Sequence, residues 1–540
     1  MKKSKCILLI VLPYMVAPTK AVISKGVRSY LAFPYGLLTV ASYVKAQAVN
    51  TPDLCILDLN LYAHDEIPNV LDQHLASKPD IVGLSFTFDV SYKHMKAITK
   101  QIKGNDSETT IVVGGPAATV SCSEILEEQQ YIDAVCYSEG ELALCRLADA
   151  EDTREALEHA PWVTRASLKE GKNPTTQYVD SLDDVIAIDY RLVNIAAYSM
   201  KEAFSPYSSY KEVESIKQFF LVTSRGCPFK CVFCAEPAFH GSAMRYASID
   251  SIIDHVEFLV DEYGMNVLTF YDDQLLLNQE RAKELFRRLA RFNLRIEMPN
   301  GVTVVYIDSE MARLMKEAGV DTIYLAIESG SDYVLREIIK KPLIVSKIRP
   351  TIEALQQNDI FVQAFFIIGF PGEREEDRQE SLKIIKTLGL DWSLFNFATP
   401  LRGSELHRIC RENGWIDEEN LGIGDVDMTE YVIRAPGIDP DHITRQIYKM
   451  NLEVNFVENH RMKIGDYETA AQCFQEVVDR HPDHPFAHYY LAQANKMMEK
   501  HPQIVDESSR RFDELVSKDP DWMAQVEMFG LNYPQANSQI

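Results

Sequence analysis

The chain has 540 residues, with 79 acidic and 55 basic side chains and a formal net charge of -24. At roughly 100–200 residues per domain, this length predicts three or four domains and excludes one small module. Hydrophobic residues make up 46 % and charged residues 25 %, which excludes a chain that is disordered throughout. The acidic balance argues against broad binding to nucleic acid, because phosphates are met with Lys and Arg.

The first apolar run, residues 6–12, could belong to a signal peptide or to a buried strand, because Lys2, Lys3 and Lys5 precede it. The run is short, partly β-branched and stopped by Pro13, so we interpret it as the first strand of a parallel sheet. No apolar run reaches the roughly 18–20 residues that span a bilayer. Ten cysteines are too few for a disulfide framework, so we expect a reducing compartment, the cytoplasm.

Residues 1–150 alternate apolar runs with helix-period segments, which is typical of a Rossmann-like, doubly wound α/β domain. Ligands of such sheets sit at the carboxyl ends of the strands. The expected strands are residues 6–12, 54–60, 81–86, 110–115 and 133–140, and the clearest helices are residues 37–48, 92–102 and 123–129.

Residues 151–215 are polar and irregular and are interpreted as a linker that packs between domains. A second series of strands and helices follows over residues 216–415. Six strands separated by helices suit a partial (β/α)6 TIM-like barrel, whose active face lies at the strand C-termini. The expected strands are residues 218–224, 267–273, 295–301, 322–329, 361–369 and 392–400.

The tail, residues 416–540, is expected to be helical. Its spacing of small and aromatic residues follows the 34-residue helix–turn–helix repeat of tetratricopeptide (TPR) proteins. Residues 506–519, closed by Pro520, are interpreted as the beginning of a second copy. One or two repeats are too few to stand alone, so we expect them to pack on the barrel; a peptide-binding solenoid is the alternative.

Three cysteines follow the first barrel strand in the spacing C-x3-C-x2-C: Cys227, Cys231 and Cys234. Thiolates are soft ligands suited to iron–sulfur clusters or to zinc, and three within eight residues can wrap one inorganic centre. A four-iron cluster held by three sulfurs keeps one iron open for a substrate. The alternatives are structural zinc with His240 as the fourth ligand, and three buried thiols without a metal.

This loop and the motifs that follow it resemble the radical S-adenosylmethionine (SAM) superfamily. Phe233 precedes the third cysteine, and residues 271–273 end the second strand. Residues 326–331, 368–373 and 398–401 end the fourth, fifth and sixth strands. The resemblance implies a [4Fe–4S] cluster held by the three cysteines, with the amino and carboxylate groups of SAM on the fourth iron.

The same motifs imply further cofactor-binding residues. Glu328 and Ser329 fall where the family contacts the methionyl ammonium and the ribose, and Gly369 falls near the adenine. Phe233 and Asp272 belong to the same set of expected SAM-site residues. A carboxylate near an ammonium is favourable, and a glycine permits close approach. The alternative for Glu328 is an ordinary surface carboxylate at a strand end.

The strand ends of the first domain resemble the cobalamin-binding domain that precedes many radical SAM barrels. The residues that carry this likeness are Ser85, Thr87, Gly114, Gly115, Glu139 and Gly140. The D-x-H-x-x-G motif, which supplies an axial histidine in other cobalamin proteins, is absent, although the fused enzymes often lack it. The same residues could instead form a nucleotide pocket or no pocket.

The resemblance implies that a radical from SAM removes hydrogen from an unactivated carbon, which then takes a methyl group from methylcobalamin. We therefore expect a C-methyltransferase for a small-molecule, lipid or peptide substrate, supplied with electrons by a donor such as flavodoxin or ferredoxin. The main alternative is a radical enzyme that forms or rearranges C–C bonds or rings without methyl transfer. A scaffold or a cobalamin-responsive sensor is the non-enzymatic alternative.

Overall fold

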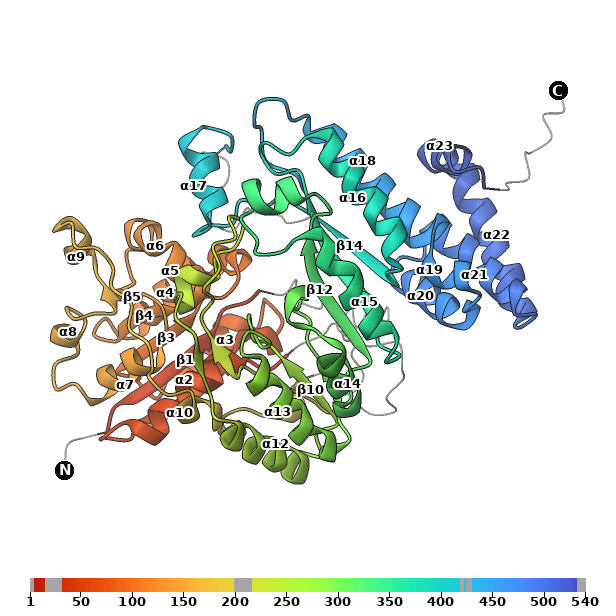
Figure 1. Cartoon of the computed structure of the whole chain (residues 1–540). Helices are drawn as coiled ribbons and strands as arrows, with labels where there is room; N and C mark the ends of the chain where they lie inside the picture. The colour runs from red at the N-terminus through yellow and green to blue at the C-terminus, as the bar shows by residue number, and fades with distance from the viewer. Residues whose placement is uncertain (1–3, 15–31, 199–215, 418–421, 424–429, 532–540) are drawn as a thin grey trace.

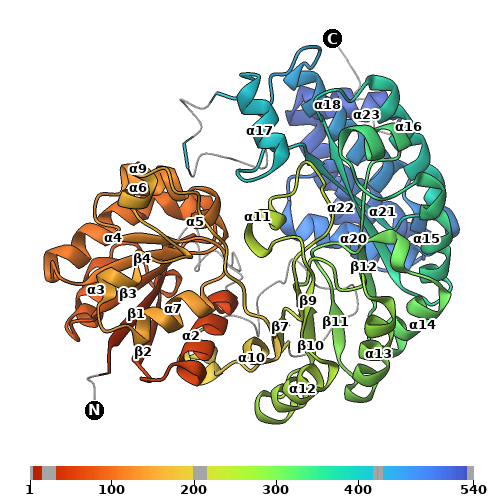
Figure 2. The ribbon, with the colours of Figure 1, turned by 60° about the vertical axis from the view of Figure 1, so that its left-hand side comes forward.

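The structure is a computed structural model that describes residues 4–14, 32–198, 216–417, 422–423 and 430–531. An N-terminal α/β unit lies beside a second α/β unit, and the helices of the tail cover the far side of the second unit (Figures 1 and 2). This mixed α/β architecture with parallel sheets confirms the predicted fold class. Among the described residues, no helix combines the length and the apolar character that crossing a bilayer requires.

The N-terminal unit is built on one six-stranded sheet in the order β2-β1-β3-β4-β5-β6. The first five strands are parallel, and β6 pairs antiparallel with β5 at the edge. The order reverses between β1 and β3, which is the switch point where flavodoxin-like sheets bind ligands. The strands are β1 (Cys6–Val11), β2 (Asp53–Asp58), β3 (Ile81–Ser85), β4 (Thr110–Gly114), β5 (Ala134–Cys136) and β6 (Trp162–Val163).

All five strands predicted in this unit are present, and the first apolar run is the buried strand β1. Helices pack on both faces of the sheet, as the strand–helix alternation predicts. They are α2 (Tyr35–Gln47), α3 (Ile67–Leu75), α4 (Tyr92–Asn105), α5 (Pro116–Val120), α6 (Cys122–Glu128) and α7 (Glu141–Asp149).

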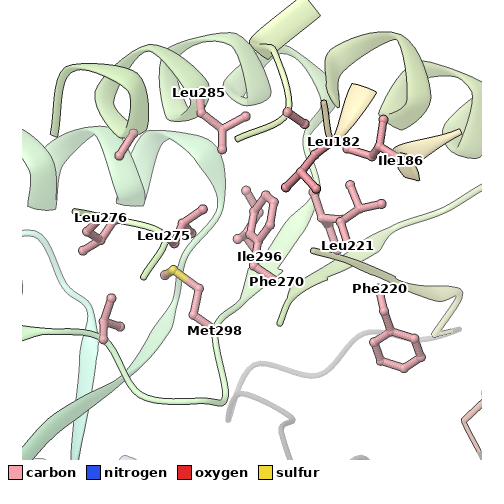
Figure 3. Close-up of a cluster of buried hydrophobic side chains, with 14 of the residues drawn as sticks. Leu182, Ile186, Phe220, Leu221, Phe270, Leu275, Leu276, Leu285, Ile296 and Met298 are labelled. Carbon is pink, nitrogen blue, oxygen red and sulfur yellow. The ribbon is translucent and has the colours of Figure 1, made fainter. Parts of the chain in front are cut away.

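The predicted linker holds more structure than its irregular sequence indicates. Its described part contains β6 and three short helices, α8 (Thr153–Ala156), α9 (Arg165–Lys169) and α10 (Asp183–Ile186). Leu182 and Ile186 point into the hydrophobic core of the second unit, toward strand residues such as Leu221 (Figure 3). Residues 199–215 of the predicted linker lie outside the described residues.

The second unit contains the six predicted strands, divided into two parallel sheets of three, β11-β10-β7 and β12-β13-β14. Between the described strands of the two sheets, an isolated backbone bridge from Val302 to Leu325 makes the connection, so the barrel is open and partial. The strands are β7 (Gln218–Leu221), β10 (Val267–Phe270), β11 (Arg295–Glu297), β12 (Thr322–Glu328), β13 (Phe361–Ile368) and β14 (Trp392–Phe397).

Helices cover the outer side of these strands, and a short hairpin, β8 (Ser224–Arg225) with β9 (Arg245–Tyr246), brackets the cysteine loop. Apolar side chains from β7, β10 and β11 meet the helices in a dry core that includes Phe270, Leu285 and Ile296 (Figure 3). The helices are α11 (Glu236–His240), α12 (Ile249–Tyr263), α13 (Gln279–Leu289), α14 (Ser309–Ala318), α15 (Ile348–Gln356) and α16 (Glu375–Leu388).

The tail is helical and packs on the barrel, as expected from its incomplete repeats. Phe456 packs against Trp392 of the edge strand β14, with ring centroids 5.6 Å apart. The helix α22 (Pro502–Lys518) covers most of predicted residues 506–519 and ends at Lys518, before Pro520, which is the first residue of the next helix. The helix α17 (Glu405–Glu412) precedes the tail. The helices of the tail are α18 (Pro440–Leu452), α19 (His460–Ile464), α20 (Tyr467–Arg480), α21 (Pro485–Met497), α22 (Pro502–Lys518) and α23 (Pro520–Met528), with a π-helical turn, η9 (Glu453–Val457), after α18.

Candidate functional site

The cysteine loop begins at the carboxyl end of the first barrel sheet and is held at both ends by backbone hydrogen bonds. Gly226 has a φ of +92°, and a Cβ there would lie 2.4 Å from the carbonyl oxygen of Ala243, so this turn requires glycine. The amide of Cys227 donates to Gly241, and the amide of Val232 donates to Ile339. The loop is therefore a fixed element that stands between its hairpin and the second barrel sheet.

Cys227, Cys231 and Cys234 line one cavity of about 150 Å³. This volume is roughly ten times the ~15 Å³ that one water molecule needs. Burial raises the pKa of all three thiols, that of Cys234 to about 12, so without a metal they are neutral. Thiols must lose their protons to bind a metal, and three soft ligands around a space of this size fit an iron–sulfur cluster.

The zinc alternative finds no support in the position of His240. Its Nδ1 donates to a carboxylate oxygen of Glu139 at 2.8 Å, and its ring lines a neighbouring cavity. Within the described part of the chain, no group of three or more Cys, His, Asp or Glu side chains is placed to hold a single metal ion.

Glu328 faces the cysteine cavity from the end of β12 and is not a surface carboxylate. Its φ is +66°, and the pairing of β12 with β13 shifts register beside it, so the strand end is bent. The Nζ of Lys341 donates to its Oε1 at 3.2 Å. Both side chains are more than nine-tenths buried, and both line the cavity. Lys341 was not predicted, because it lies in a short polar stretch that indicates an exposed loop.

Phe233 also lines the cysteine cavity. Three other predicted SAM-site residues, Asp272, Ser329 and Gly369, do not line it but hold backbone segments beside it. Asp272 accepts hydrogen bonds from the amide and hydroxyl of Thr223 and from the hydroxyl of Ser224, which fixes the start of the cysteine loop. The Ser329 hydroxyl is buried and accepts from the amide of Ser331. The structure therefore does not bring Asp272 or Ser329 to the cavity surface.

Gly369 lies at the end of β13 beneath a tyrosine from the C-terminal region. Its φ is +96°, and a Cβ there would lie 2.6 Å from the ring of Tyr431. Its amide donates to Glu373 at 2.6 Å, and its carbonyl accepts from the Tyr431 hydroxyl at 2.5 Å. Glycine is required here by the backbone turn and by the close tyrosine, and Tyr431 was not predicted.

A second, larger cavity of about 670 Å³ lies between the two α/β units. It opens at the carboxyl ends of β3, β4 and β5, beside the switch point of the sheet. All six residues predicted for cobalamin line it: Ser85, Thr87, Gly114, Gly115, Glu139 and Gly140. Gly115 has a φ of +115°, and a Cβ there would meet the carbonyl oxygen of Phe86 at 2.5 Å, so its own backbone requires glycine.

The two cavities share three lining residues, Glu236, Asp273 and Asn300. The side-chain nitrogen of Asn300 donates to the backbone carbonyl of Tyr271 at 3.0 Å, so the side-chain oxygen of Asn300 is turned away from Tyr271. Burial and the neighbouring Asp273 carboxyl raise the pKa of Glu236 to about 9. At neutral pH the junction therefore combines a protonated Glu236 carboxyl, which can donate a hydrogen bond, with the acceptor oxygens of Asp273 and Asn300. Its position could not be predicted, because the three residues come from separate loops.

Glu139 is bonded on both carboxylate oxygens. Arg245 donates to it twice, at 2.9 and 2.5 Å, and His240 donates once. Burial opposes the charge of Glu139, but these hydrogen bonds outweigh it and hold its pKa well below the usual range. Glu139 is thus part of the contact between the two units as well as part of the cavity wall.

Family models match the two units separately. A model described as the radical SAM superfamily matches residues 221–385, and a model described as a B12 binding domain matches residues 23–148. An uncharacterized methyltransferase of Pyrococcus horikoshii is 30 % identical over 404 residues, which cover 74 % of this chain and 82 % of that protein. The chain therefore belongs to the radical SAM superfamily and carries a B12-binding domain, as its motifs predicted. It is a radical SAM enzyme.

Among the named relatives, the cytidylyl-2-hydroxyethylphosphonate methyltransferase of Streptomyces wedmorensis is 29 % identical over 443 residues, 76 % of this chain and 81 % of that protein. The radical SAM methyltransferase TsrM of Kitasatospora setae, solved with cobalamin and a [4Fe–4S] cluster, has a TM-score of 0.57 at 15 % identity and covers 83 % of this chain and 89 % of its own. The cobalamin-dependent enzyme OxsB, solved with aqua-cobalamin and SAM, has a TM-score of 0.56 at 14 % identity, covering 98 % of this chain and 82 % of its own. These structures share the fold and hold the three predicted cofactors.

Proposed function

We propose that this chain is a cobalamin-dependent C-methyltransferase that acts on an unactivated carbon of a small-molecule substrate. The observation that carries the proposal is the shared wall between the cavity lined by the three cysteines and the larger cavity at the strand ends of the B12-binding domain. When bound, the cluster with SAM supplies a 5′-deoxyadenosyl radical, and cobalamin supplies the methyl group. A substrate held at Glu236, Asp273 and Asn300 would face both cofactors.

In this proposal Cys227, Cys231 and Cys234 hold the cluster. Glu328 and Lys341 form a pair of opposite charges on the wall of the same cavity, which suits the ammonium and the carboxylate of an amino acid. We assign Glu328 to the SAM ammonium and Lys341 to its carboxylate. Phe233 contributes an apolar wall, and Ser329, Asp272 and Gly369 hold the surrounding strand ends.

We assign cobalamin to the larger cavity. The mostly apolar lining, with small residues at the ends of β3 and β4, leaves room for a large planar ring. Ser85, Thr87, Gly114, Gly115, Glu139 and Gly140 form its wall on the side of the N-terminal unit. The chain's own contribution is to orient both cofactors and to keep water from the junction.

Ring formation without methyl transfer remains the second candidate, because one relative, 25 % identical over 345 residues, is the anaerobic magnesium-protoporphyrin IX monomethyl ester cyclase of Cereibacter sphaeroides. This chain covers 52 % of that protein but 81 % of the Streptomyces methyltransferase, which favours methyl transfer. We place the enzyme in the cytoplasm, with flavodoxin or ferredoxin as its electron donor.

The test is anaerobic reconstitution with iron, sulfide and cobalamin, followed by visible spectra and by iron and cobalt analysis. Reduced enzyme is then incubated with SAM labelled in its methyl group and with candidate small-molecule substrates. Label retained in a product supports methyl transfer, whereas 5′-deoxyadenosine with an unlabelled product supports the ring-forming alternative. Protein that loads neither iron nor cobalt would contradict the proposal.

A further inference from the structure

A group of buried charges crosses the contact between the two α/β units. Arg225 of the barrel lies between two carboxylates of the N-terminal unit: its Nη2 donates to Glu141 at 2.7 Å, and its Nη1 lies 3.2 Å from Glu139. The exposed fraction is 7 % for the Arg225 side chain, 2 % for Glu139 and 3 % for Glu141. Arg245 and His240 complete the pairing of Glu139.

Arg225, Glu139 and Glu141 all line the larger cavity, and Arg225 also connects to the cysteine loop through the backbone. Arg225 is the last residue of β8 and stands two residues before Cys227, separated from it by the glycine turn at Gly226. Glu139 and Glu141 flank Gly140 at the end of β5, where the larger cavity is lined. The backbone that carries the cysteines and the backbone that lines the proposed cobalamin cavity are therefore joined through one guanidinium.

The energetics indicate that these buried charges fix the geometry of the contact more than they stabilise it. Burying charges carries a large desolvation cost before pairing, and well-packed apolar residues often stabilise a contact as much or more. A guanidinium between two carboxylates, in contrast, fixes direction as well as distance, because its donors lie in one plane. Another hydrogen bond between the units, from the amide of Val222 to the hydroxyl of Tyr35, joins neighbouring segments but does not hold the loop itself.

We propose that Arg225 is a positioning residue that sets the cysteine loop relative to the cobalamin cavity. The inference rests on the proposed function. Reductive cleavage of SAM takes one electron at the cluster, breaks the S–C5′ bond and yields methionine and 5′-deoxyadenosine, once a hydrogen atom is taken up from the medium. Transfer of the SAM methyl group to reduced cobalamin yields S-adenosylhomocysteine and requires SAM and cobalamin to meet. Only the second reaction depends on how the two units are placed.

The experiment measures both nucleoside products in one reaction without a substrate. Wild type, Arg225→Met and Glu141→Gln are reconstituted with iron, sulfide and cobalamin, reduced with titanium(III) citrate and supplied with SAM. We expect the ratio of S-adenosylhomocysteine to 5′-deoxyadenosine to fall about tenfold or more in Arg225→Met, and less in Glu141→Gln, because small displacements between reactants have large effects on rate. Iron and cobalt contents stay near those of wild type.

The matched control is Glu297→Gln. Glu297 pairs with Arg295 at 2.6 Å, and the two side chains are 6 % and 8 % exposed, but both belong to β11 within the barrel. This variant removes a comparably buried charge, so we expect it to lower thermal stability and leave the product ratio unchanged.

Several outcomes would overturn the inference. An unchanged ratio in both interface variants, an equal fall of both products, or the same change in Glu297→Gln would each show that Arg225 contributes to stability alone. Loss of iron from both interface variants, but not from the control, would reduce Arg225 to a folding role, and loss of cobalt alone would make it a cobalamin-binding residue, because Arg225 lines the larger cavity. A wild-type enzyme that binds no cobalamin or makes neither product would instead contradict the proposed function.

Discussion

The role of each residue at the cysteine cavity depends on the side chain with which it pairs. Glu328 could be predicted from its motif, but its pairing with Lys341 could not, because the lysine is brought back by the π-helical turn that follows β12. A lysine in a short polar stretch is normally solvated, and only the fold turns this one inward. The pair therefore gives the clearest test of the SAM assignment.

Lys341→Met is expected to weaken SAM binding to the reconstituted enzyme by about tenfold or more, since a hydrogen bond to a charged group contributes about 1.5–3 kcal/mol. Equilibrium dialysis with SAM and with decarboxylated SAM measures the effect. The loss should be confined to SAM, because the analogue lacks the carboxylate that Lys341 would meet. Lys340→Met, at an exposed neighbour, is the control; equal losses for both ligands would contradict the assignment.

His255 of α12 is buried against Tyr190, and its Nε2 has no hydrogen-bond partner among the described residues. Burial lowers the pKa of His255 to about 4. The unfolded chain binds this proton near pH 6.5 and the folded chain does not, so stability contributed by this site is lost as the pH falls from 6.5 toward 4.

His255→Phe keeps a ring in this place and removes the titration. We expect its stability to depend less on pH than that of wild type, with up to about 3 kcal/mol of the acid loss removed. Thermal unfolding of both proteins between pH 7 and pH 4.5 measures the difference. Melting temperatures that fall in parallel would show that the imidazole is not the group responsible.

Elements were predicted well wherever burial of apolar residues alone defines them. Most strands of both units are apolar runs, and every predicted strand is present, although β11 ends at Glu297, four residues before the predicted end. The two-residue strand β6, which lies in the predicted linker, was not predicted. The chain continues there as a turn, and the bridge from Val302 restores the connection to the next sheet. The helix α10 was missed, because four residues carry no period and only its tertiary contacts stabilise it.

One asparagine of the tail covers part of the edge of β14. Asn455, in the π-helical turn η9, accepts from the amide of Ser393 and donates to its carbonyl, both at 2.8 Å. It thus supplies the hydrogen bonds that a further strand would give to β14. Strand edges left unpaired promote association with other chains, and this one is covered by a side chain.

Asn455→Ala should leave both backbone groups of Ser393 without this partner, at a cost of about 2–4 kcal/mol. Hydrogen–deuterium exchange of the Ser393 amide reports the change directly, and thermal unfolding followed by tryptophan fluorescence reports its size. Asn495→Ala is the matched control, since Asn495 is similarly buried and its side-chain amide donates to the Leu491 carbonyl of its own helix. Equal protection of Ser393 in both variants would argue against this role.

At the scale of the whole molecule, the site exists only because two units meet. The sequence identifies the strand ends of each unit, but which side chains stand on their common boundary depends on how the units dock, and no local pattern records that. Several residues show this: the positions of Glu236, Asp273, Arg225 and Tyr431 are each defined by contacts with segments far away in the sequence.

We also expect that a change confined to one cavity alters the binding of its own cofactor and leaves the binding of the other unchanged. Thr87 lines the larger cavity with an exposed side chain at the end of β3 and takes no part in the cysteine cavity. Thr87→Trp is expected to reduce cobalamin binding at least tenfold by filling space, while the iron content of the reconstituted protein stays unchanged. Absorbance titration with cobalamin measures the first, and iron analysis the second.

A tryptophan at Val49, which is 87 % exposed on the same unit, controls for bulk alone. Unaltered cobalamin affinity in Thr87→Trp would contradict the assignment of cobalamin to this cavity.

The ion pairs between the two units also restrict which substitutions evolution can accept at these positions and which chimeric proteins can fold. Loss of Arg225 takes the guanidinium from the buried Glu141 and leaves Glu139 to Arg245 and His240, and loss of Glu141 leaves the buried Arg225 with one carboxylate. We therefore expect evolution to exchange these positions together or to keep all of them. Chimeras that graft the first 150 residues of one homologue onto the barrel of another should accordingly succeed only where both parents carry the same trio.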